Sequence, residues 1–465
     1  MKKSGYVMTA VILASMGFAD VAQAESLQEA LSTAYINNPA LQARRARLRA
    51  VDEQVPQALS GWRPTVRLQA EAGRERFSTN LSTAGGGEQY RNPATYAVSV
   101  NQPLYSGGRT VASTDQAENN VLSERASLLS AEQQVLFDVA SSYVNVVRDQ
   151  AVVELNVGSQ QVLRRQLEAA QDRFRVGEVT RTDVAQAEAR VAGATADVQL
   201  AESNLQASRA AYQNVVGTAP GRLASPGAIP VEPKSLAEAV ALALQTNPNV
   251  VAAEFAARSA EAGVDVARAD LLPQVSLTGD FTRALDTQST SSELNNLGAA
   301  VVLSVPIYEA GAVYSRVRQQ KHVAGQRRIE IDQIRRDATE SATQAWEALQ
   351  ASQARSASLV TQIRSAEIAL EGVEREAQVG SRTVLDVLNA EQELLNARVS
   401  LVRSQRDEAV AAFQLKAAIG TLTAQALALP VDVYDPTAHY QDVRGRWIGT
   451  DVEPVPGADY GSRAQ

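Results

Sequence analysis

The chain has 465 residues, a formal net charge of −8, only two histidines and no cysteine. The missing cysteine excludes disulfides, thiol catalysis, cysteine metal ligands and a lipid anchor on an N-terminal cysteine. Two separate histidines, His322 and His439, argue against a histidine metal site or a catalytic triad, and an acidic chain has no basic field to hold nucleic acid. We therefore expect no metal, no cofactor and no nucleic-acid partner.

Residues 1–24 have the three parts of an export signal. The basic start MKK precedes the short apolar run VMTAVILASMGF, and AQA ends at Ala24 in the small-x-small form of a signal-peptidase site. We predict cleavage there, with the mature chain beginning at Glu25; the alternative is a buried core helix. No later stretch has the roughly 18 consecutive apolar residues of a membrane helix. An exported chain of this kind would therefore enter a membrane only through strands.

The remaining chain consists of two tandem copies of one pattern. SLQEALSTAYINNPAL at 26–41 aligns with SLAEAVALALQTNPNV at 235–250, and RVGEVTRTDVAQAEA at 175–189 aligns with QVGSRTVLDVLNAEQ at 378–392. A single short deletion between these segments accounts for the change in alignment offset, so chance is a poor explanation for the similarity.

These copies set the domain organisation. We place the first structural repeat at 25–222 and the second at 235–424, joined by a Pro/Gly-rich linker at 223–234. The C-terminal tail, 425–465, is polar and carries proline and glycine, so we expect it to be disordered.

Each repeat is expected to open with a helix that begins at a capping box. Ser26 and Ser235 are the N-cap residues, each followed three residues later by a glutamate. The opening helix is expected to continue without a break to about Ser60 in the first repeat and Asp270 in the second.

A strand hairpin follows in each repeat, at about 63–105 and 273–308, because apolar and polar residues alternate there. The segment STNLSTAGGGEQYRNP, 78–93, is rich in turn residues and is expected to be the loop of the first hairpin. Four strands cannot close a barrel, and open strand edges are not tolerated in lipid. The hairpins therefore either pair in a soluble sheet or pool with those of other chains. Strands of about 10–14 residues, with aromatic residues clustered near both ends, favour pooling in a membrane.

Two helices follow the first hairpin. Residues 109–175 contain no proline and only one glycine, Gly158, which predicts a helix of about 67 residues and about 100 Å. After a break at Gly177, a shorter helix is expected from about Thr180 to Val216. The second repeat shows the same pattern. The fold class is therefore mostly α with a smaller β part, in which long antiparallel helices pack as in coiled coils.

This layout resembles a known family. QPLYSGG at 102–108, VPIYEAG at 305–311 and, above all, the element VG-x5-DV-x2-AE in each repeat resemble the TolC family of outer-membrane efflux and secretion channels. The resemblance implies a homotrimer whose twelve pooled strands form a transmembrane β-barrel, continuous with a long periplasmic α-barrel. It also implies the outer membrane of a Gram-negative bacterium, contact with its lipid, and no enzymatic activity. The implied partners are a periplasmic adaptor protein and an inner-membrane pump or ABC transporter.

The resemblance also implies where such a channel is gated. Its periplasmic tips correspond to the turns at Val176–Gly177 and Val379–Gly380, where the adaptor would dock. Asp183 and Arg382 correspond to a gate link, within or between protomers. We hypothesise that Arg382→Ser or Asp183→Ala raises conductance; the alternative is that both residues are solvated helix charges.

Two further positions correspond to the family's constriction. Asp386 and Asn389 are spaced i, i+3, and therefore share a helix face. The family pattern has aspartate at both positions, whereas this chain has a neutral amide at the second. Three Asp386 carboxylates facing a narrow lumen would attract cations and raise one another's pKa. The neutral Asn389 predicts weaker binding of multivalent cations than a double ring of aspartates would give.

The junctions between strand and helix are also repeated. We expect a proline to end strand pairing, a tyrosine to lie in the inner headgroup layer and a glycine to let the chain turn into the helix. These residues are Pro103, Tyr105 and Gly108 in the first repeat and Pro306, Tyr308 and Gly311 in the second.

The leading functional hypothesis is a passive exit duct of a tripartite efflux pump or a type I secretion system. The alternative is a soluble periplasmic coiled-coil scaffold or adaptor. An enzyme would need a nucleophile–base constellation or a phosphate loop, and the sequence contains neither. The sequence does not specify the cargo, which could be a drug, a metal, a polysaccharide or a protein.

Overall fold

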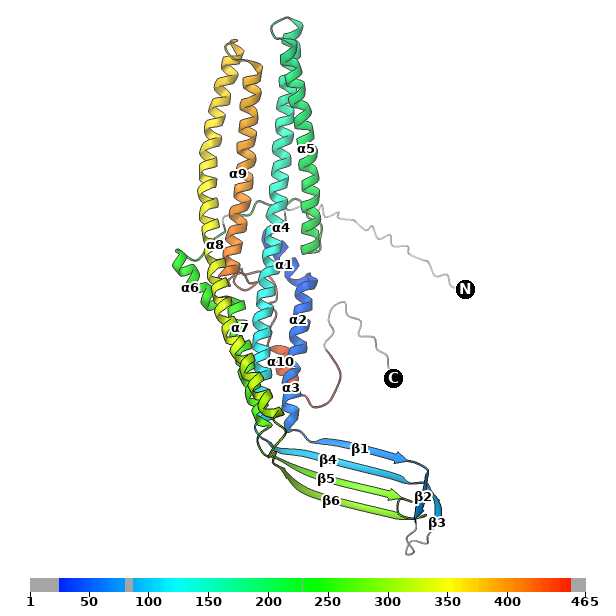
Figure 1. Ribbon diagram of the computed structural model, residues 1–465. Helices are drawn as coiled ribbons and strands as arrows, with labels where there is room; N and C mark the ends of the chain where they lie inside the picture. Colours follow the sequence, from blue (N-terminus) through cyan, green and yellow to red (C-terminus); the bar gives the residue numbers. More distant parts are fainter. Residues whose placement is uncertain (1–24, 80–86, 228, 453–465) are drawn as a thin grey trace, which may run out of the picture.

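The structure is a computed structural model that describes residues 25–79, 87–227 and 229–452, and Figure 1 shows a long helical bundle with a sheet leading away from one end at a steep angle. The helices of the first repeat are α1 (Leu27–Asn37), α2 (Pro39–Asp52), α3 (Gln54–Leu59), the 3-10 helix η1 (Ser60–Trp62), α4 (Arg109–Arg175) and α5 (Arg181–Val216). The helices of the second repeat and the tail are α6 (Leu236–Thr246), α7 (Pro248–Ala269), α8 (Ala312–Gln378), α9 (Val384–Ala418) and α10 (Ala438–Arg444). The strands are β1 (Thr65–Ala72), β2 (Glu75–Thr79), β3 (Gly87–Arg91), β4 (Ala94–Ser106), β5 (Gln274–Leu285) and β6 (Glu293–Ser304).

The longest helices, α4 and α8, are equivalent elements of the two repeats and have 67 residues each. At one end, α4 packs against α5 and α8 packs against α9, which gives the two helical hairpins at the top of Figure 1. Towards the sheet, α4 packs against α2 and α7, and α7 also packs against α8. Each long helix therefore spans two shorter helices placed end to end.

The opening helix of each repeat is broken, which the sequence analysis did not predict. Asn38 ends α1 and caps α2, because its Oδ1 accepts the backbone N–H of Ala40 at 2.9 Å. Pro39 follows at the first position of α2, where a missing N–H costs no helical hydrogen bond. The same Asn-Pro step, Asn247–Pro248, separates α6 from α7.

The largest buried cluster lies where α1, α4, α5 and α9 meet. Tyr143 and Tyr212 are fully buried there, with ring centroids 6.4 Å apart. The Tyr143 hydroxyl donates to the backbone oxygens of Glu25 (2.8 Å) and Ala224 (2.7 Å), and the Tyr212 hydroxyl donates to the Glu25 carboxylate (2.6 Å). Burial raises the pKa of Tyr143 to about 12 and also raises the pKa of Tyr212. Residue 25 and the linker are thus fixed to the bundle.

Four strands form one antiparallel sheet in the order β1-β4-β5-β6. Paired residues of adjacent strands point to the same face, so a row of partners shows what each face carries. Leu68, Val98, Phe281 and Leu297 form one such row across all four strands. Leu68 and Leu297, at the two edges, are 72% and 83% exposed. Much of this face is therefore apolar and open, and its charged pair, Arg283 with Glu293, lies near the far ends of β5 and β6.

The opposite face of this sheet is polar. Its central row consists of Arg67, Ser99, Asp280 and Gly298, and the neighbouring residues on this face include threonines and asparagines. The sheet of the described residues is open, with β1 and β6 as its edges.

A second small sheet corrects the predicted loop at 78–93. Glu75–Thr79 pairs with Gly87–Arg91, so part of that segment is strand β3 rather than loop. Nη1 of Arg91 donates to the backbone oxygens of Thr287 (2.8 Å) and Gln288 (2.9 Å), in the turn between β5 and β6. This long-range contact was not visible in a local composition dominated by turn residues.

The tail also differs from the prediction of disorder. Residues 425–452 follow the bundle and include α10, which packs on α2 and α3. The Tyr35 hydroxyl accepts the backbone N–H of Tyr434 at 3.1 Å, and Nδ1 of His439 lies 3.1 Å from the Asp52 carboxylate. Aromatic and basic side chains give this polar segment specific partners on the helices. Residues 453–465 and the predicted export signal, 1–24, lie outside the described residues.

Candidate functional site at the helical tips

Two equivalent turns form the tips of the helical hairpins. Gly177 and Gly380 have φ values of +83° and +80°, in the left-handed region that glycine adopts at helix C-termini. In each turn, the backbone N–H of the residue after the glycine bonds back to a carbonyl of the last helical turn: Glu178 to Arg173, and Ser381 to Glu376. The flanking valines are largely exposed, Val176 by 72% and Val379 by 80%. Each tip therefore presents an apolar side chain on a tightly hydrogen-bonded turn.

The two predicted gate aspartates occupy the same position in the two repeats. Asp183 is the third residue of α5, and its carboxylate accepts the N–H and the hydroxyl of Thr180 at 2.9 and 2.8 Å. Asp386 is the third residue of α9 and accepts the same two groups of Thr383 at 3.0 and 2.9 Å. Both carboxylates complete capping boxes. The Thr-x-x-Asp spacing in the sequence could have predicted this local role.

Arg382 does not pair with Asp183 in the protomer. Its Nε lies 2.9 Å from Oε2 of Glu376, in the last turn of α8. The hydrogen bonds from Thr383, with a smaller contribution from the charge of Arg382, lower the pKa of Asp386. Within one protomer the pKa of Asp386 is thus lowered, whereas a ring of three Asp386 carboxylates is expected to raise it.

Asn389 has a partner that the sequence analysis missed. Nη2 of Arg190, on α5, donates to its Oδ1 at 2.8 Å. Near these two residues along the helices, Ala187 of α5 and Leu388 of α9 are fully buried in a cluster that also includes Leu163 and Ala170 of α4. The tips of the two repeats are therefore joined by one polar bond and an apolar contact. The sequence held no signal for this pair, because it joins two separate helical hairpins.

At the other end of the helices, the predicted junction glycines lie where the long helices begin. Gly108 and Gly311, with φ of +82° and +79°, are the N-cap residues of α4 and α8. Pro103, however, does not end strand pairing: it pairs with Ser276, and a bulge follows before Tyr105. A bulge accommodates a residue without a backbone N–H inside a strand.

The second junction is less regular than the first. Strand β6 ends at Ser304, so Pro306 and Tyr308 lie in an irregular link before α8. Tyr308 is 79% exposed and Tyr105 is 45% exposed. Both tyrosines thus lie on the surface, at the base of the sheet.

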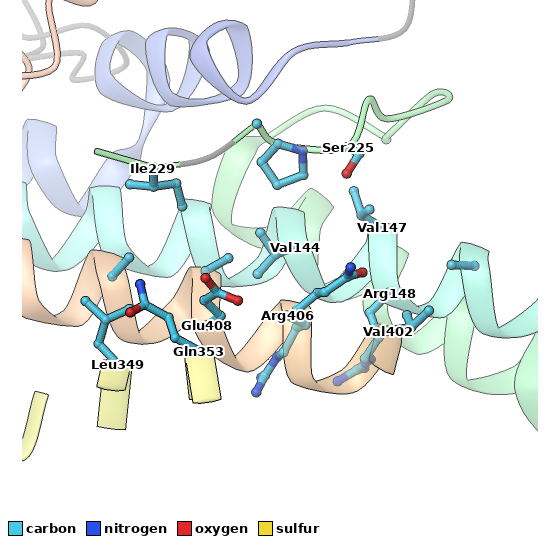
Figure 2. Close-up of a pocket in the computed structure, with 16 residues that line it drawn as sticks. Val144, Val147, Arg148, Ser225, Ile229, Leu349, Gln353, Val402, Arg406 and Glu408 are labelled. Carbon is cyan, nitrogen blue, oxygen red and sulfur yellow. The ribbon is translucent and has the colours of Figure 1, made fainter. Parts of the chain in front are cut away.

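A cavity of about 400 Å³ lies between α4, α8, α9 and the linker (Figure 2). Its lining mixes apolar side chains such as Val144 with Arg148 and Arg406. Arg148 pairs with Asp149 at 2.8 Å, and Arg406 pairs with Asp407 at 2.8 Å. The lining contains no histidine or cysteine, its two arginines are paired, and Glu408 supplies its carboxylate.

Among the described residues, no group of three or more His, Cys, Asp or Glu side chains is placed to hold a metal ion. No helix in the described part of the chain combines the length and the apolar character needed to cross a membrane.

The repeat architecture matches a family model. The model described as outer membrane efflux protein matches residues 30–218 and 239–421, one segment in each repeat. The chain belongs to the outer membrane efflux protein family. It is therefore an outer-membrane channel protein of a Gram-negative bacterium with a large periplasmic helical portion, and a transport conduit rather than an enzyme.

Individual relatives agree with this assignment. This efflux protein is 34% identical over 430 residues to the outer membrane efflux protein BepC of Brucella suis, over 92% of both chains. It is 27% identical over 411 residues to the outer membrane protein TolC of Vibrio cholerae, covering 86% of this chain and 92% of that protein. Its fold matches the crystal structure of VceC from Vibrio cholerae with a TM-score of 0.73 at 22% identity, covering 85% and 96% of the two chains.

Proposed function

We propose that three copies of this efflux protein form a gated exit duct, in which twelve pooled strands cross the outer membrane and the helices form a periplasmic tunnel. A periplasmic adaptor would join the duct to an inner-membrane pump or ABC transporter. Cargo would move passively through the tunnel, since the protomer has no chemistry to act on it.

The two-faced sheet is the observation that carries this proposal. A row of apolar side chains crosses all four strands on one face, and polar residues line the other face. A barrel in lipid needs this alternation, apolar outward and polar inward. In a soluble scaffold the open apolar face would be an aggregation hazard, which disfavours the alternative function.

The edges of the sheet support pooling. Strands β1 and β6 each leave one row of backbone N–H and C=O groups without a strand partner among the described residues. In lipid, each such group would cost several kcal/mol. If β1 of one protomer pairs with β6 of the next, a ring of protomers has no free edge.

The tips supply the gate and the docking surface of the proposal. At the tips of each protomer, the contact between repeats includes the bond between Arg190 and Asn389 and the small cluster around Leu388. Such a contact can yield when a partner binds. The exposed Val176 and Val379 offer apolar contacts to an adaptor hairpin on rigid turns.

Engineered cysteines test the pooled barrel directly, because the natural chain has none. Gln69→Cys on β1 would be combined in turn with Asn296→Cys, Ala300→Cys and Val302→Cys on β6. These three residues lie on the same polar face as Gln69 and sample different registers between protomers. Oxidation in membranes is expected to give covalent dimers and trimers on a denaturing gel, with no larger product.

A matched control uses the interior of the sheet. Ser99 and Asp280 are direct partners on β4 and β5, so Ser99→Cys with Asp280→Cys is expected to give only an internal disulfide. If the edge pairs stay monomeric while this control pair oxidises, pooling is wrong. If they form ladders beyond three chains, the trimer is wrong.

A further inference from the structure

The segment that follows α10 returns to the junction between helices and sheet. Nη1 of Arg63 donates to the backbone oxygen of Arg446 at 2.7 Å. The guanidinium carbon of Arg63 also lies 4.8 Å from the ring centroid of Trp447, in cation–π geometry. Arg63 lies between η1 and the start of β1. Trp447 is thus held beside the point where the first strand begins.

The contacts that α10 makes with α4 and α2 also hold the segment around Trp447 in place. Nη2 of Arg444 and the Tyr440 hydroxyl both donate to Oε1 of Glu118 on α4, at 2.9 and 3.2 Å. His439 pairs with Asp52, which is fully buried at the end of α2. Figure 1 shows α10 beside the lower part of the helices, above the sheet. The segment is therefore tied to the helices and arrives at the junction by specific bonds.

Two large apolar side chains at this place have little protein cover. Trp447 is 66% exposed and Ile448 is 91% exposed. Arg446 precedes the pair and Gly449 follows it, so the apolar stretch of this segment is two residues long. A stable protein–protein interface needs about 800 Å² on each partner, which is far more than this pair provides.

Other aromatic residues are exposed at the same level. Trp62 adjoins Arg63 and is 42% exposed, and its backbone oxygen accepts the side-chain amide of Gln102 from β4. Tyr105 and Tyr308, at the two junctions, are also exposed. Tryptophan and tyrosine favour the boundary between headgroups and acyl chains, where the ring is buried and its polar atom stays hydrated.

We propose that Trp447 and Ile448 insert into the phospholipid leaflet that faces the periplasm, so that the C-terminal segment is an interfacial membrane anchor. The inference rests on the proposed function, in which the strands cross the outer membrane. Arg63 and Arg446 lie beside the pair and would face lipid phosphates. The anchor holds the helices at a fixed level relative to the bilayer, independently of the strands.

The natural distribution of tryptophan provides the test. The chain has three tryptophans, Trp62, Trp346 and Trp447. Three variants each keep one of them and carry phenylalanine at the other two positions. Each is reconstituted as the full chain into phospholipid vesicles whose acyl chains carry bromine, a fluorescence quencher, just below the headgroup. Retention of Trp447 is expected to give about a twofold loss of emission relative to unbrominated vesicles, with weaker quenching when bromine lies at the chain ends.

The other two variants separate the two proposals. Trp346 lies on α8 beside the cluster around α6, far from the junction along the helix, and is expected to remain unquenched. Trp62 reports whether the base of the sheet reaches the bilayer. Quenching of Trp62 without quenching of Trp447 would overturn the anchor and leave the membrane duct intact. An unquenched, blue-shifted Trp447 would place it against a neighbouring protomer, which also contradicts the anchor. If neither residue is quenched, the membrane placement of the sheet is itself wrong.

Discussion

Arg190 of the first repeat donates a hydrogen bond of 2.8 Å to Asn389 of the second, close to the tips of the long helices. Ala187 and Leu388, close to these two residues along α5 and α9, are fully buried in one apolar cluster. Farther from the tips, α4 packs against α5 and α8 against α9, and α4 also packs against α9, where Nε of Arg406 donates to Oδ1 of Asn145 at 2.7 Å. The bond between Arg190 and Asn389 is thus a specific connection by which the two hairpins set their separation at the proposed gate.

Arg190→Ala is expected to loosen the tips. Loss of one hydrogen bond of this kind costs about 1 kcal/mol, or about a fivefold shift towards the separated state. Single-channel recording in planar bilayers should therefore show higher mean conductance or more frequent opening than the wild type. Arg181→Ala, at an exposed arginine in the first turn of the same helix, is the matched control and should leave the currents unchanged. Equal currents in all three proteins would contradict a gating role for the bond.

Asn389→Asp is expected to strengthen block by a trivalent cation, but only modestly. Arg190 already faces this position, so it would pair with the new carboxylate and neutralise much of its charge. The double variant Arg190→Ala/Asn389→Asp removes that neutralisation and should be blocked at a lower cation concentration than either single variant. Non-additive effects of this kind are expected for residues in contact. Block that is the same in the wild type and the double variant would contradict a lumenal position for Asn389.

Some of this site follows from sequence, and some does not. Gly177 and Gly380 could be predicted because a helix end with a left-handed residue favours glycine strongly. The 109–175 helix has the same bounds as α4 because nothing in that stretch breaks a helix. The partner of Arg382 could not be predicted from the sequence. Its long side chain reaches Glu376 within its own tip, and sequence spacing alone does not show which of several nearby carboxylates an arginine will pair with.

Two of the errors share a physical cause. The attachment of the β2–β3 hairpin and the order of the tail both involve contacts between residues about 200 or more positions apart. Arg91 reaches the turn after β5, and Tyr434 reaches Tyr35 on α1. Local composition at these places resembles a loop, and tertiary bonds override it. The break at Asn38–Pro39 is different, because its capping signal was present in the sequence and was missed.

Glu132 is expected to make stability depend on pH. It lies on α4 and accepts the backbone N–H of Ala424 at 2.7 Å, and burial raises its pKa from the ordinary value of 4.5. A raised pKa means that the protonated form stabilises the fold. This contribution is complete below pH 4.5 and is lost as the pH rises through the folded-state pKa. Glu132→Gln keeps an acceptor for Ala424 and removes the titration.

The measurement is thermal unfolding of the detergent-solubilised protein across this pH range. Relative to the wild type, the Glu132→Gln variant should gain on the order of 1 °C in Tm as the pH rises from about 4 to about 8. Glu154→Gln, at an exposed glutamate on the same helix, should show no such trend. A Tm difference that stays constant with pH would show that the burial of Glu132 is not coupled to its ionisation.

Arg91→Ala is expected to release the small β2–β3 hairpin from the main sheet. The side chain is buried, donates to the carbonyls of Thr287 and Gln288, and lies 4.0 Å from the ring centroid of Phe77. Its removal leaves two carbonyls without this donor and should cost about 1–3 kcal/mol locally. Limited proteolysis of the protein in vesicles should then cut within residues 75–91 several-fold faster than in the wild type. Arg76→Ala removes an exposed pair with Glu88 in the same hairpin and should change the rate little. Equal cleavage rates for both variants would contradict the anchoring role of Arg91.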